Sequence, residues 1–529
     1  MNLDLLGFLL VIVIAFALTA RCTIFSGAQA RRMKWRARMR MRPGPGFATI
    51  AELYVRWGRW SAWHHGRWAR PSMRWRRRAI TPATEYAVRL GRGPLFRTCW
   101  ARKEDQTIVI APPRIRKSQL LADRIINHPG PALVTESRPD IYTATAGFRH
   151  RRGPVEMFNP ELVAGLPSTF RWAITDGCDN PGEAYRRASD LVGAVADTGE
   201  MRWWVEKSAS ALAAAMHCAG LLGDDMAAVW AWSNHSYDGL ISHAASLPGV
   251  SDELISALTE LERPGKTADS IRITMSKALQ WLGIPEIRAI VTGRAAVPYD
   301  VGAFTDSCGT IYMLAPGGDN SPEAPLFRCF GGYVHRQAKM HAQTMPARKL
   351  DPGLLFAIDE LHLMPVDLPH WMADSAGSNV EVVAVIHSTG QLEDKYGKAG
   401  ERTVWSTAGT KIFLPGITDT DTLKAVSMLG GTMPHGEARE NPCIPVEFLT
   451  RLPDLRALVF RMNLTPTVVK FRPVFSRIGV RLHGLPPPPV LHADPATIEI
   501  PATLNGHRPT PPTWPTAPLP ATDDDESAA

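Results

Sequence analysis

The sequence predicts an α/β protein whose central sheet is largely parallel. Three short apolar runs have the length and composition of buried strands: TIVIA at Thr107–Ala111, LLFAI at Leu354–Ile358 and VEVVAVI at Val380–Ile386. Stretches with apolar residues at helical spacing lie between and after them. Strands that alternate with helices favour parallel pairing through crossover connections. At 529 residues, 45% of them hydrophobic, the chain is long enough for two or three domains.

The first predicted element is a membrane-spanning helix. Residues 5–20 read LLGFLLVIVIAFALTA, without a charge or a proline, which with the flanking residues is roughly the ~17–25 residues that a spanning helix needs. A cleaved signal peptide is the alternative, but it normally starts with a basic region, and the only early charge is Asp4. The basic flank at 31–42 predicts that the body of the chain faces the cytoplasm. We therefore expect a single-pass cell-membrane protein anchored by residues 1–30.

A segment rich in arginine and tryptophan follows the predicted anchor. Residues 31–78 hold 15 basic residues against a single acid, Glu52, and six tryptophans are interleaved. Such a mixture suits an anionic membrane surface, where cations bind headgroups and indoles lie at the boundary. It also suits nucleic acid, through phosphate pairing and base stacking. A topology signal with a solvated face is the third interpretation, and all three stay open.

The first candidate site is a loop between the strand at 107–111 and an amphipathic stretch. Strand, loop with Lys-Ser, then helix is the context that a phosphate-binding loop requires. In it, Lys117 would reach the β- and γ-phosphates of ATP, and the Ser118 hydroxyl would bind Mg²⁺. Both motif glycines are replaced, and Arg116 stands where glycine permits close approach. The candidate nucleotide-binding residues are Ala111, Pro112, Pro113, Arg114, Ile115, Arg116, Lys117 and Ser118.

A second candidate site follows the strand at 354–358. That strand ends in Asp359-Glu360, the arrangement in which an aspartate holds Mg²⁺ and a glutamate orients or deprotonates the attacking water. Asp359 is thus predicted as a metal ligand beside Ser118, and Glu360 as a catalytic residue. The third strand, at 380–386, ends in His387.

The regions between and after these motifs differ in composition and in the spacing of their apolar residues. Residues 181–295 show apolar residues at helical spacing and predict an all-α domain inserted into the α/β core. From residue 484 the chain is proline-rich and then acidic, which predicts a disordered tail. The seven cysteines are scattered, without the spacing of a zinc site or a disulfide framework.

Several longer stretches resemble a known family. FNPELVAGLPSTFRW at 158–172 and LLFAIDELHLMPVDLPHW from Leu354 are similar to TraG/TraD-like coupling proteins of type IV secretion systems, as found in Gram-positive conjugative elements. EVVAVIHSTGQLEDKYG and TVWSTAGTKIFLPGITDTDTL extend the similarity, which covers about residues 45–480.

The resemblance implies a RecA-like P-loop ATPase core with an inserted all-α domain and a homo-hexameric ring. It also implies that the protein recruits a relaxase-type protein with single-stranded DNA and works with other type IV secretion components. Three positions depart from the family pattern: Arg116 replaces a glycine, His387 a glutamine that senses the γ-phosphate, and Ser378-Asn379 an arginine that acts across a subunit interface. His387 can still donate a hydrogen bond, so we count it as a catalytic candidate.

We therefore expect an organisation of six segments: an anchor (1–30), a basic segment (31–80), a first nucleotide-binding part (81–180), the all-α insertion (181–295), a second nucleotide-binding part (296–483) and the tail (484–529). The leading function is an ATP-driven coupling protein. The departures leave a non-hydrolysing, membrane-tethered adaptor of the same fold as the alternative. A double-stranded DNA translocase of the segregation type fits less well, because such proteins usually carry several membrane helices and a C-terminal winged-helix domain. An unrelated basic membrane protein is the last possibility.

Overall fold

The computed structural model describes residues 46–113, 115–195, 202–234, 238–292, 299–318, 321–434, 440–471 and 473–474. The predicted anchor at 1–30 and the predicted tail at 484–529 lie outside these ranges. Among the helices that are described, none combines the length and the apolar character that a membrane span requires.

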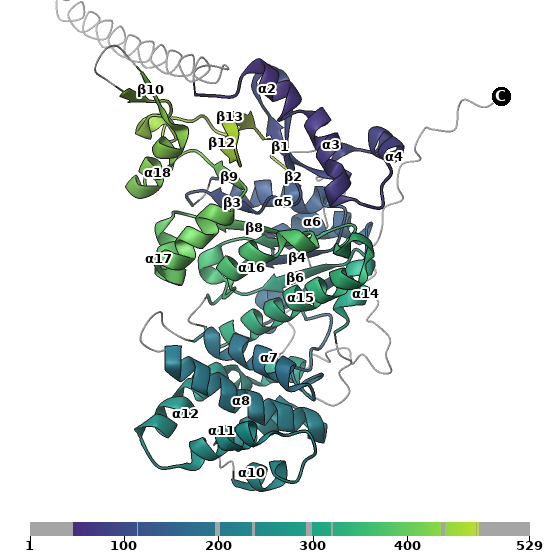
Figure 1. Ribbon diagram of the computed structural model, residues 1–529, viewed down its shortest axis with the longest axis vertical. Helices are drawn as coiled ribbons and strands as arrows, with labels where there is room; N and C mark the ends of the chain where they lie inside the picture. The colour runs from purple at the N-terminus through teal and green to yellow at the C-terminus, as the bar shows by residue number, and fades with distance from the viewer. Residues whose placement is uncertain are drawn as a thin grey trace, which may run out of the picture.

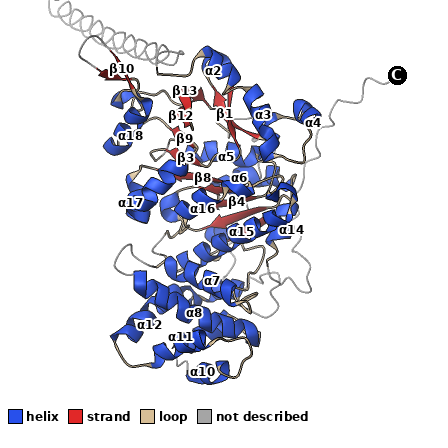
Figure 2. Cartoon of the chain, in the orientation of Figure 1, coloured by secondary structure: helices blue, strands red, loops and turns tan. Residues whose placement is uncertain are grey.

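A single mixed sheet of eleven strands organises the described chain (Figure 2). Its order is β2-β1-β13-β12-β9-β3-β8-β7-β4-β6-β5. The seven strands from β9 to β5 pair in parallel, as predicted. The other four, β12, β13, β1 and β2, extend one edge by antiparallel pairing. The strands are β1 (Ala87–Arg92), β2 (Thr98–Arg102), β3 (Thr107–Ile110), β4 (Ala132–Glu136), β5 (Val155–Phe158), β6 (Thr310–Leu314), β7 (Leu354–Ile358), β8 (Val380–Ile386), β9 (Thr410–Phe413), β12 (Arg456–Arg461) and β13 (Leu464–Lys470), beside a separate hairpin of β10 (Thr432–Pro434) and β11 (Glu440–Pro442).

Both faces of the parallel part are covered, which explains why its strands are apolar throughout. On one face, Val109 of β3 and Val383 of β8 pack in a core with α5 (Lys117–Asn127) and α6 (Asp140–His150). On the other face, Ile108 and Val382 join a core with α15 (Ala324–Thr344) and α16 (Leu368–Asp374). Three further helices lie around the sheet: α14 (Val301–Asp306), α17 (Gly390–Thr407) and α18 (Thr420–Gly430).

The segment predicted as an all-α insertion forms a helical body at one end of the molecule (Figure 1). Its elements are α7 (Pro181–Gly193), α8 (Arg202–Leu222), α9 (Met226–Asn234), α10 (Asp238–Ala244), α11 (Asp252–Glu262), α12 (Lys266–Ala278) and α13 (Pro285–Val291). Helix α8 is the centre of this body: Leu212, Ala215 and Met216 are buried, and α7, α11 and α12 pack around it. The aromatic residues Trp172 and Phe330 continue this core toward α15, because their rings are in contact.

The basic segment contributes three short helices, α2 (Ile50–Val55), α3 (Arg59–Ala69) and α4 (Trp75–Ile80), at the antiparallel edge of the sheet. Thr49 and Glu52 form a reciprocal capping box that begins α2. Trp57 is fully buried, and its carbonyl accepts a hydrogen bond from the backbone of Trp100 in β2 (2.9 Å). These helices are therefore attached to the sheet.

Candidate nucleotide-binding site

The predicted site residues converge because their strands are neighbours in the sheet. Strand β8 lies between β3 and β7, so the carboxyl ends of all three meet at one edge. The loop at 111–116 leaves β3, Asp359 and Glu360 leave β7, and His387 leaves β8. Ligands of parallel α/β sheets bind at this kind of edge.

Arg116 has the backbone conformation that glycine supplies in a phosphate-binding loop. Arg116 has φ 54° and ψ 28°, the left-handed conformation, and stands directly before the first residue of α5. The replaced glycine is thus a position that needs a positive φ, and arginine adopts it at a cost of ~1–2 kcal/mol. The Arg116 side chain is exposed. The first N–H groups of α5 consequently point toward the loop, as an anion site requires.

The remaining loop residues shape the entrance. Ala111 is buried, Pro112 and Ile115 are partly buried, and Pro113 is exposed. A Cβ built on Gly416, after β9, would lie 3.6 Å from Ile115, so this second loop covers the first. Arg114 lies outside the described residues.

Lys117 and Glu360 form an ion pair at the centre of the site. The Lys117 ammonium donates to Glu360 Oε1 at 2.7 Å, and the two side chains are 9% and 27% exposed. Lys117 is the first residue of α5, and Glu360 has φ 53°, a left-handed turn that directs the chain away from β7. The catalytic candidate and the phosphate-binding candidate are therefore in direct contact.

Ser118 and Asp359 form the second contact. The Ser118 hydroxyl donates to Asp359 Oδ2 at 3.1 Å. Asp359 Oδ1 is buried, with no hydrogen-bond partner among the described residues. Burial raises the pKa of this carboxyl, although Lys117 opposes the change. A hydroxyl and a buried carboxylate with an unused oxygen are hard ligands of the kind that Mg²⁺ prefers.

Glu360 is held by a residue that the sequence did not single out. The Ser137 hydroxyl, after β4, donates to Glu360 Oε2 at 2.8 Å, so both carboxylate oxygens are engaged. Burial alone would raise the pKa of Glu360, but the hydrogen bonds from Lys117 and Ser137 lower it. These two contacts therefore favour the charged form of Glu360.

His387 fastens β8 to the start of the loop. Its Nδ1 lies 2.8 Å from the Ala111 carbonyl, and the Ala111 N–H donates to the Ile386 carbonyl at 2.9 Å. Because a carbonyl only accepts, Nδ1 carries a proton in this contact. The His362 ring lies 5.1 Å away, centroid to centroid, and burial followed by His387 lowers the pKa of His362.

Ser378 and Asn379 lie at the opposite edge of the sheet. Both are buried directly before β8 begins, so they are not brought to the site within this chain. The Asn379 amide donates to the carbonyls of Ala69 (2.9 Å) and Leu350 (2.7 Å), and its φ is 60°. Within one subunit, this position connects α3 to the loop before β7.

The comparisons with known proteins agree with this geometry. Residues 353–441, which include Asp359, Glu360 and His387, match the family described as the TraM recognition site of TraD and TraG. The predicted resemblance to TraG/TraD-like coupling proteins is confirmed. A search among curated proteins found no match.

Solved structures of a coupling protein share the fold. Unbound bacterial conjugative coupling protein TrwBdeltaN70 is 18% identical, with a TM-score of 0.51 over 70% of this chain and 85% of that one. The plasmid coupling protein TrwB in complex with ADP and Mg²⁺ is 18% identical, with a TM-score of 0.53 over 70% and 85%. TrwB with the non-hydrolysable GTP analogue GDPNP is 19% identical, with a TM-score of 0.52 over 70% and 86%. The predicted α/β core is therefore confirmed, and its fold is that of TrwB.

Two residues beside the candidate site escaped the sequence interpretation. Ser137 is one of many serines after a strand, and only the pairing of β4 with β7 places it against Glu360. Glu136 is fully buried and accepts the N–H groups of Ile141 (2.8 Å) and Tyr142 (2.9 Å), which fixes the start of α6. Burial raises its pKa well above the usual range. An acid at the end of a buried strand was the one available signal for Glu136.

Proposed function

We propose that this protein is an ATP-driven coupling protein of a conjugation system. In this proposal it is anchored in the cell membrane, recruits a relaxase-type protein with single-stranded DNA, and drives their transfer into a type IV secretion channel with other components of that system. The convergence of Lys117, Ser118, Asp359 and Glu360 carries the proposal. The family match at 353–441 and the titles of the TrwB structures, which name a conjugative coupling protein and its nucleotide complexes, support it.

The site residues have complementary roles in this proposal. The ammonium of Lys117 and the N–H groups at the start of α5 bind the phosphates of ATP. Ser118 and Asp359 would hold Mg²⁺, because Asp359 Oδ1 has no hydrogen-bond partner among the described residues. Bound Mg²⁺ would supply charge neutralisation at the phosphate oxygens. Glu360 accepts a proton from the attacking water or orients it, which requires the ion pair with Lys117 to open first.

The proposal includes a homo-hexamer, because P-loop sites of this type are commonly completed by a neighbouring subunit. The all-α body at 181–295 stands apart from the nucleotide site and offers a surface for the recruited protein (Figure 1). The nearest alternative is a membrane-tethered adaptor that does not hydrolyse ATP. Arg116 in the loop and the structural contacts of Asn379 favour that alternative.

ATP turnover by the full-length chain, with and without single-stranded DNA, tests the proposal. Glu360→Gln removes the proposed catalytic carboxylate, and Glu253→Gln on α11 is the matched control, because that acid is exposed and remote. Turnover that DNA stimulates, that Glu360→Gln abolishes and that Glu253→Gln retains is the expected result. Neither turnover nor nucleotide binding in the parent chain would overturn the proposal in favour of the adaptor.

A further inference from the structure

The exposed side of α3 and α4 concentrates cations and indoles on one surface. Trp60, Trp68 and Trp75 are 64%, 51% and 59% exposed, although tryptophan is usually buried in large part. The arginines that accompany them are exposed as well. We call this surface the Arg/Trp face; its residues are Arg59, Trp60, Arg67, Trp68, Arg74, Trp75, Arg76 and Arg77.

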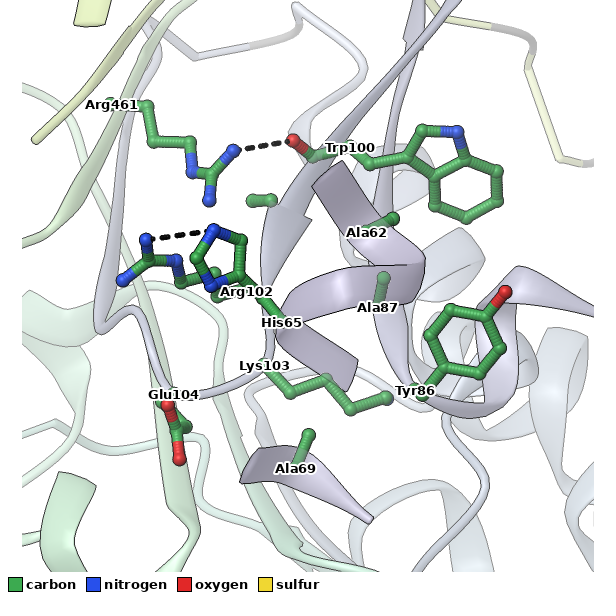
Figure 3. Close-up of a pocket in the computed structure, with 11 residues that line it drawn as sticks. Ala62, His65, Ala69, Tyr86, Ala87, Trp100, Arg102, Lys103, Glu104 and Arg461 are labelled. Carbon is green, nitrogen blue, oxygen red and sulfur yellow. Dashed lines mark hydrogen bonds between the residues drawn. The ribbon is translucent and has the colours of Figure 1, made fainter. Parts of the chain in front are cut away.

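The inner side of α3 explains why these residues face outward. Ala62, Gly66 and Ala69 are buried against β1 and β2. A Cβ on Gly66 would lie 2.5 Å from the Tyr86 ring, so only glycine allows this approach. Figure 3 shows Ala62, His65 and Ala69 on this inner side, with His65 hydrogen-bonded to Arg102. The packing therefore fixes which side of α3 meets solvent.

The end of α3 is fastened to the α/β core. Arg70 pairs with Asp351 at 2.5 Å, and the backbone N–H of Ser72 donates to the same carboxylate at 2.6 Å. Asn379, before β8, donates to the Ala69 carbonyl at 2.9 Å. Anything that binds the Arg/Trp face consequently holds the whole core.

The charge of this region is of one sign. Residues 53–84 contain no acid, and the Glu52 carboxylate is engaged by Thr49 and Thr465. Among the described residues, Arg70 is the arginine of this region that forms an ion pair, with Glu85 and Asp351, and the five arginines of the Arg/Trp face form none. An anionic partner is therefore complementary to this face.

The arrangement of the rings separates a lipid surface from nucleic acid. Arg67 lies over the Trp68 ring at 4.9 Å, and Arg76 over the Trp75 ring at 5.3 Å. Each guanidinium covers one face of its ring, so that face is closed to a stacking base. At a lipid boundary, by contrast, indoles lie among headgroups beside cations. Ile80, 84% exposed at the end of α4, adds an aliphatic contact that nucleotides do not require.

We infer that the Arg/Trp face is a docking surface for an anionic membrane leaflet. The inference rests on the proposed membrane attachment, since residues 31–45 lie between the predicted anchor at 1–30 and the described residues that carry this face. Fully extended, these 15 residues span at most about 50 Å, so the face can reach the bilayer or stay away from it. Docking would hold the ATPase core in one orientation relative to the membrane, which an anchor on a linker does not do.

The test uses the full-length chain in vesicles of phosphatidylcholine alone or mixed with phosphatidylglycerol, with brominated lipid as a quencher of tryptophan emission. We expect quenching in the anionic vesicles, and its loss in the variant Trp60→Ser, Trp68→Ser, Trp75→Ser. Trp203→Ser on α8, also an exposed tryptophan, is the matched control that leaves the quenching unchanged.

A second variant tests the charges. Neutralising Arg59, Arg67 and Arg76 to Gln should lower the docking equilibrium about a hundredfold, since one arginine near an anionic surface contributes about fivefold. Arg263→Gln with Lys266→Gln on the all-α body, where both residues are exposed, is the control. Binding of a single-stranded oligonucleotide is measured with the same variants.

The outcomes separate the docking surface from the anchor. Flotation of the vesicles in a density gradient measures whether the chain is attached to them at all. Flotation with both kinds of vesicle, without quenching in either, would overturn the docking surface and leave the anchor standing. Flotation with anionic vesicles alone, with quenching, would overturn the anchor and support the face. Flotation with neither would overturn both. A loss of oligonucleotide affinity in the arginine variant, with quenching unchanged, would assign the face to nucleic acid.

Discussion

Replacing Glu360 by glutamine should tighten nucleotide binding while it abolishes turnover. In the structure, the Lys117 ammonium is bound to Glu360 at 2.7 Å, and the same ammonium is the proposed phosphate ligand. Nucleotide therefore has to take Lys117 from Glu360. Glutamine removes the charge that holds Lys117 but preserves the size of the side chain and its hydrogen bond to Ser137.

The exposure of the two side chains sets how much free energy the attraction between Lys117 and Glu360 contributes. Exposed ion pairs contribute about 0–1 kcal/mol, and breaking a fully buried pair costs about 3–5 kcal/mol. Lys117 is 9% exposed and Glu360 27%, so we take about 1–2 kcal/mol for the attraction that nucleotide must overcome. The glutamine carbonyl still accepts a neutral hydrogen bond, which favours the lower end, or about fivefold tighter binding. Loss of a general base lowers turnover by about 10²–10⁴-fold.

Titration calorimetry with a non-hydrolysable ATP analogue, beside steady-state turnover, measures both quantities. Lys117→Ala should lose affinity, which shows that the lysine is the shared partner, and Glu253→Gln should change neither quantity. An affinity that falls in Glu360→Gln together with turnover would refute the reasoning, because Glu360 would then support binding directly.

Three further predictions follow from single contacts. Ser137→Ala removes a hydrogen bond that lowers the pKa of Glu360, so the acidic limb of the turnover profile should move to higher pH, while Ser137→Thr keeps it in place. Burial, with Lys339 nearby, lowers the pKa of His335 to about 3 in the folded chain. In the unfolded chain the pKa of this histidine has its ordinary value of 6.5, so the unfolded chain binds a proton between these two pH values and the folded chain does not. Stability is then fully present above pH 6.5 and falls on acidification by up to ~1.4 kcal/mol per pH unit; urea midpoints at two pH values should show a smaller fall in His335→Gln. Asn379→Ala loses two buried hydrogen bonds at a left-handed position and should cost about 2–3 kcal/mol by thermal unfolding, with part of it, but not all, recovered in Asn379→Gly.

The parallel half of the sheet could be predicted because its strands carry their own signal. Strands β3, β7 and β8 are buried on both faces and therefore read as continuous apolar runs in the sequence. The acids that follow β7 and the Lys-Ser pair that follows β3 then had to meet at one edge. The antiparallel edge offered no such signal. Strands β1 and β2 mix buried and partly exposed residues, and β1 joins the rest of the sheet through β13, more than 350 residues away.

The replaced glycine shows what a motif cannot convey. Arg116 departs from the pattern in residue type, yet its φ of 54° keeps the backbone that the pattern encodes. The strain involved is about 1–2 kcal/mol, which surrounding packing can offset. Composition also failed to predict the packing of residues 50–80. The segment is so rich in arginine that the small residues on the inner side of α3 were not recognised as a buried face. Ser137 acts through one hydrogen bond and Asn379 through two, all to other segments of the chain, and no local pattern marks either residue.

The place of β3 between β8 and β9 also governs how this chain is made. Both neighbours of the strand at 107–110 come from residues 380–413, so a ribosome must add about 270 residues before β3 has its first partner and about 300 before it has both. In the meantime the helical body at 181–291 can form from contacts that are close in sequence, which fold quickly. Until then β3 is an apolar strand without a pairing partner, and such unpaired strands are prone to aggregate. Any fragment that ends before residue 380 should therefore contain a folded helical body and an insoluble α/β part, with the nucleotide loop in the latter.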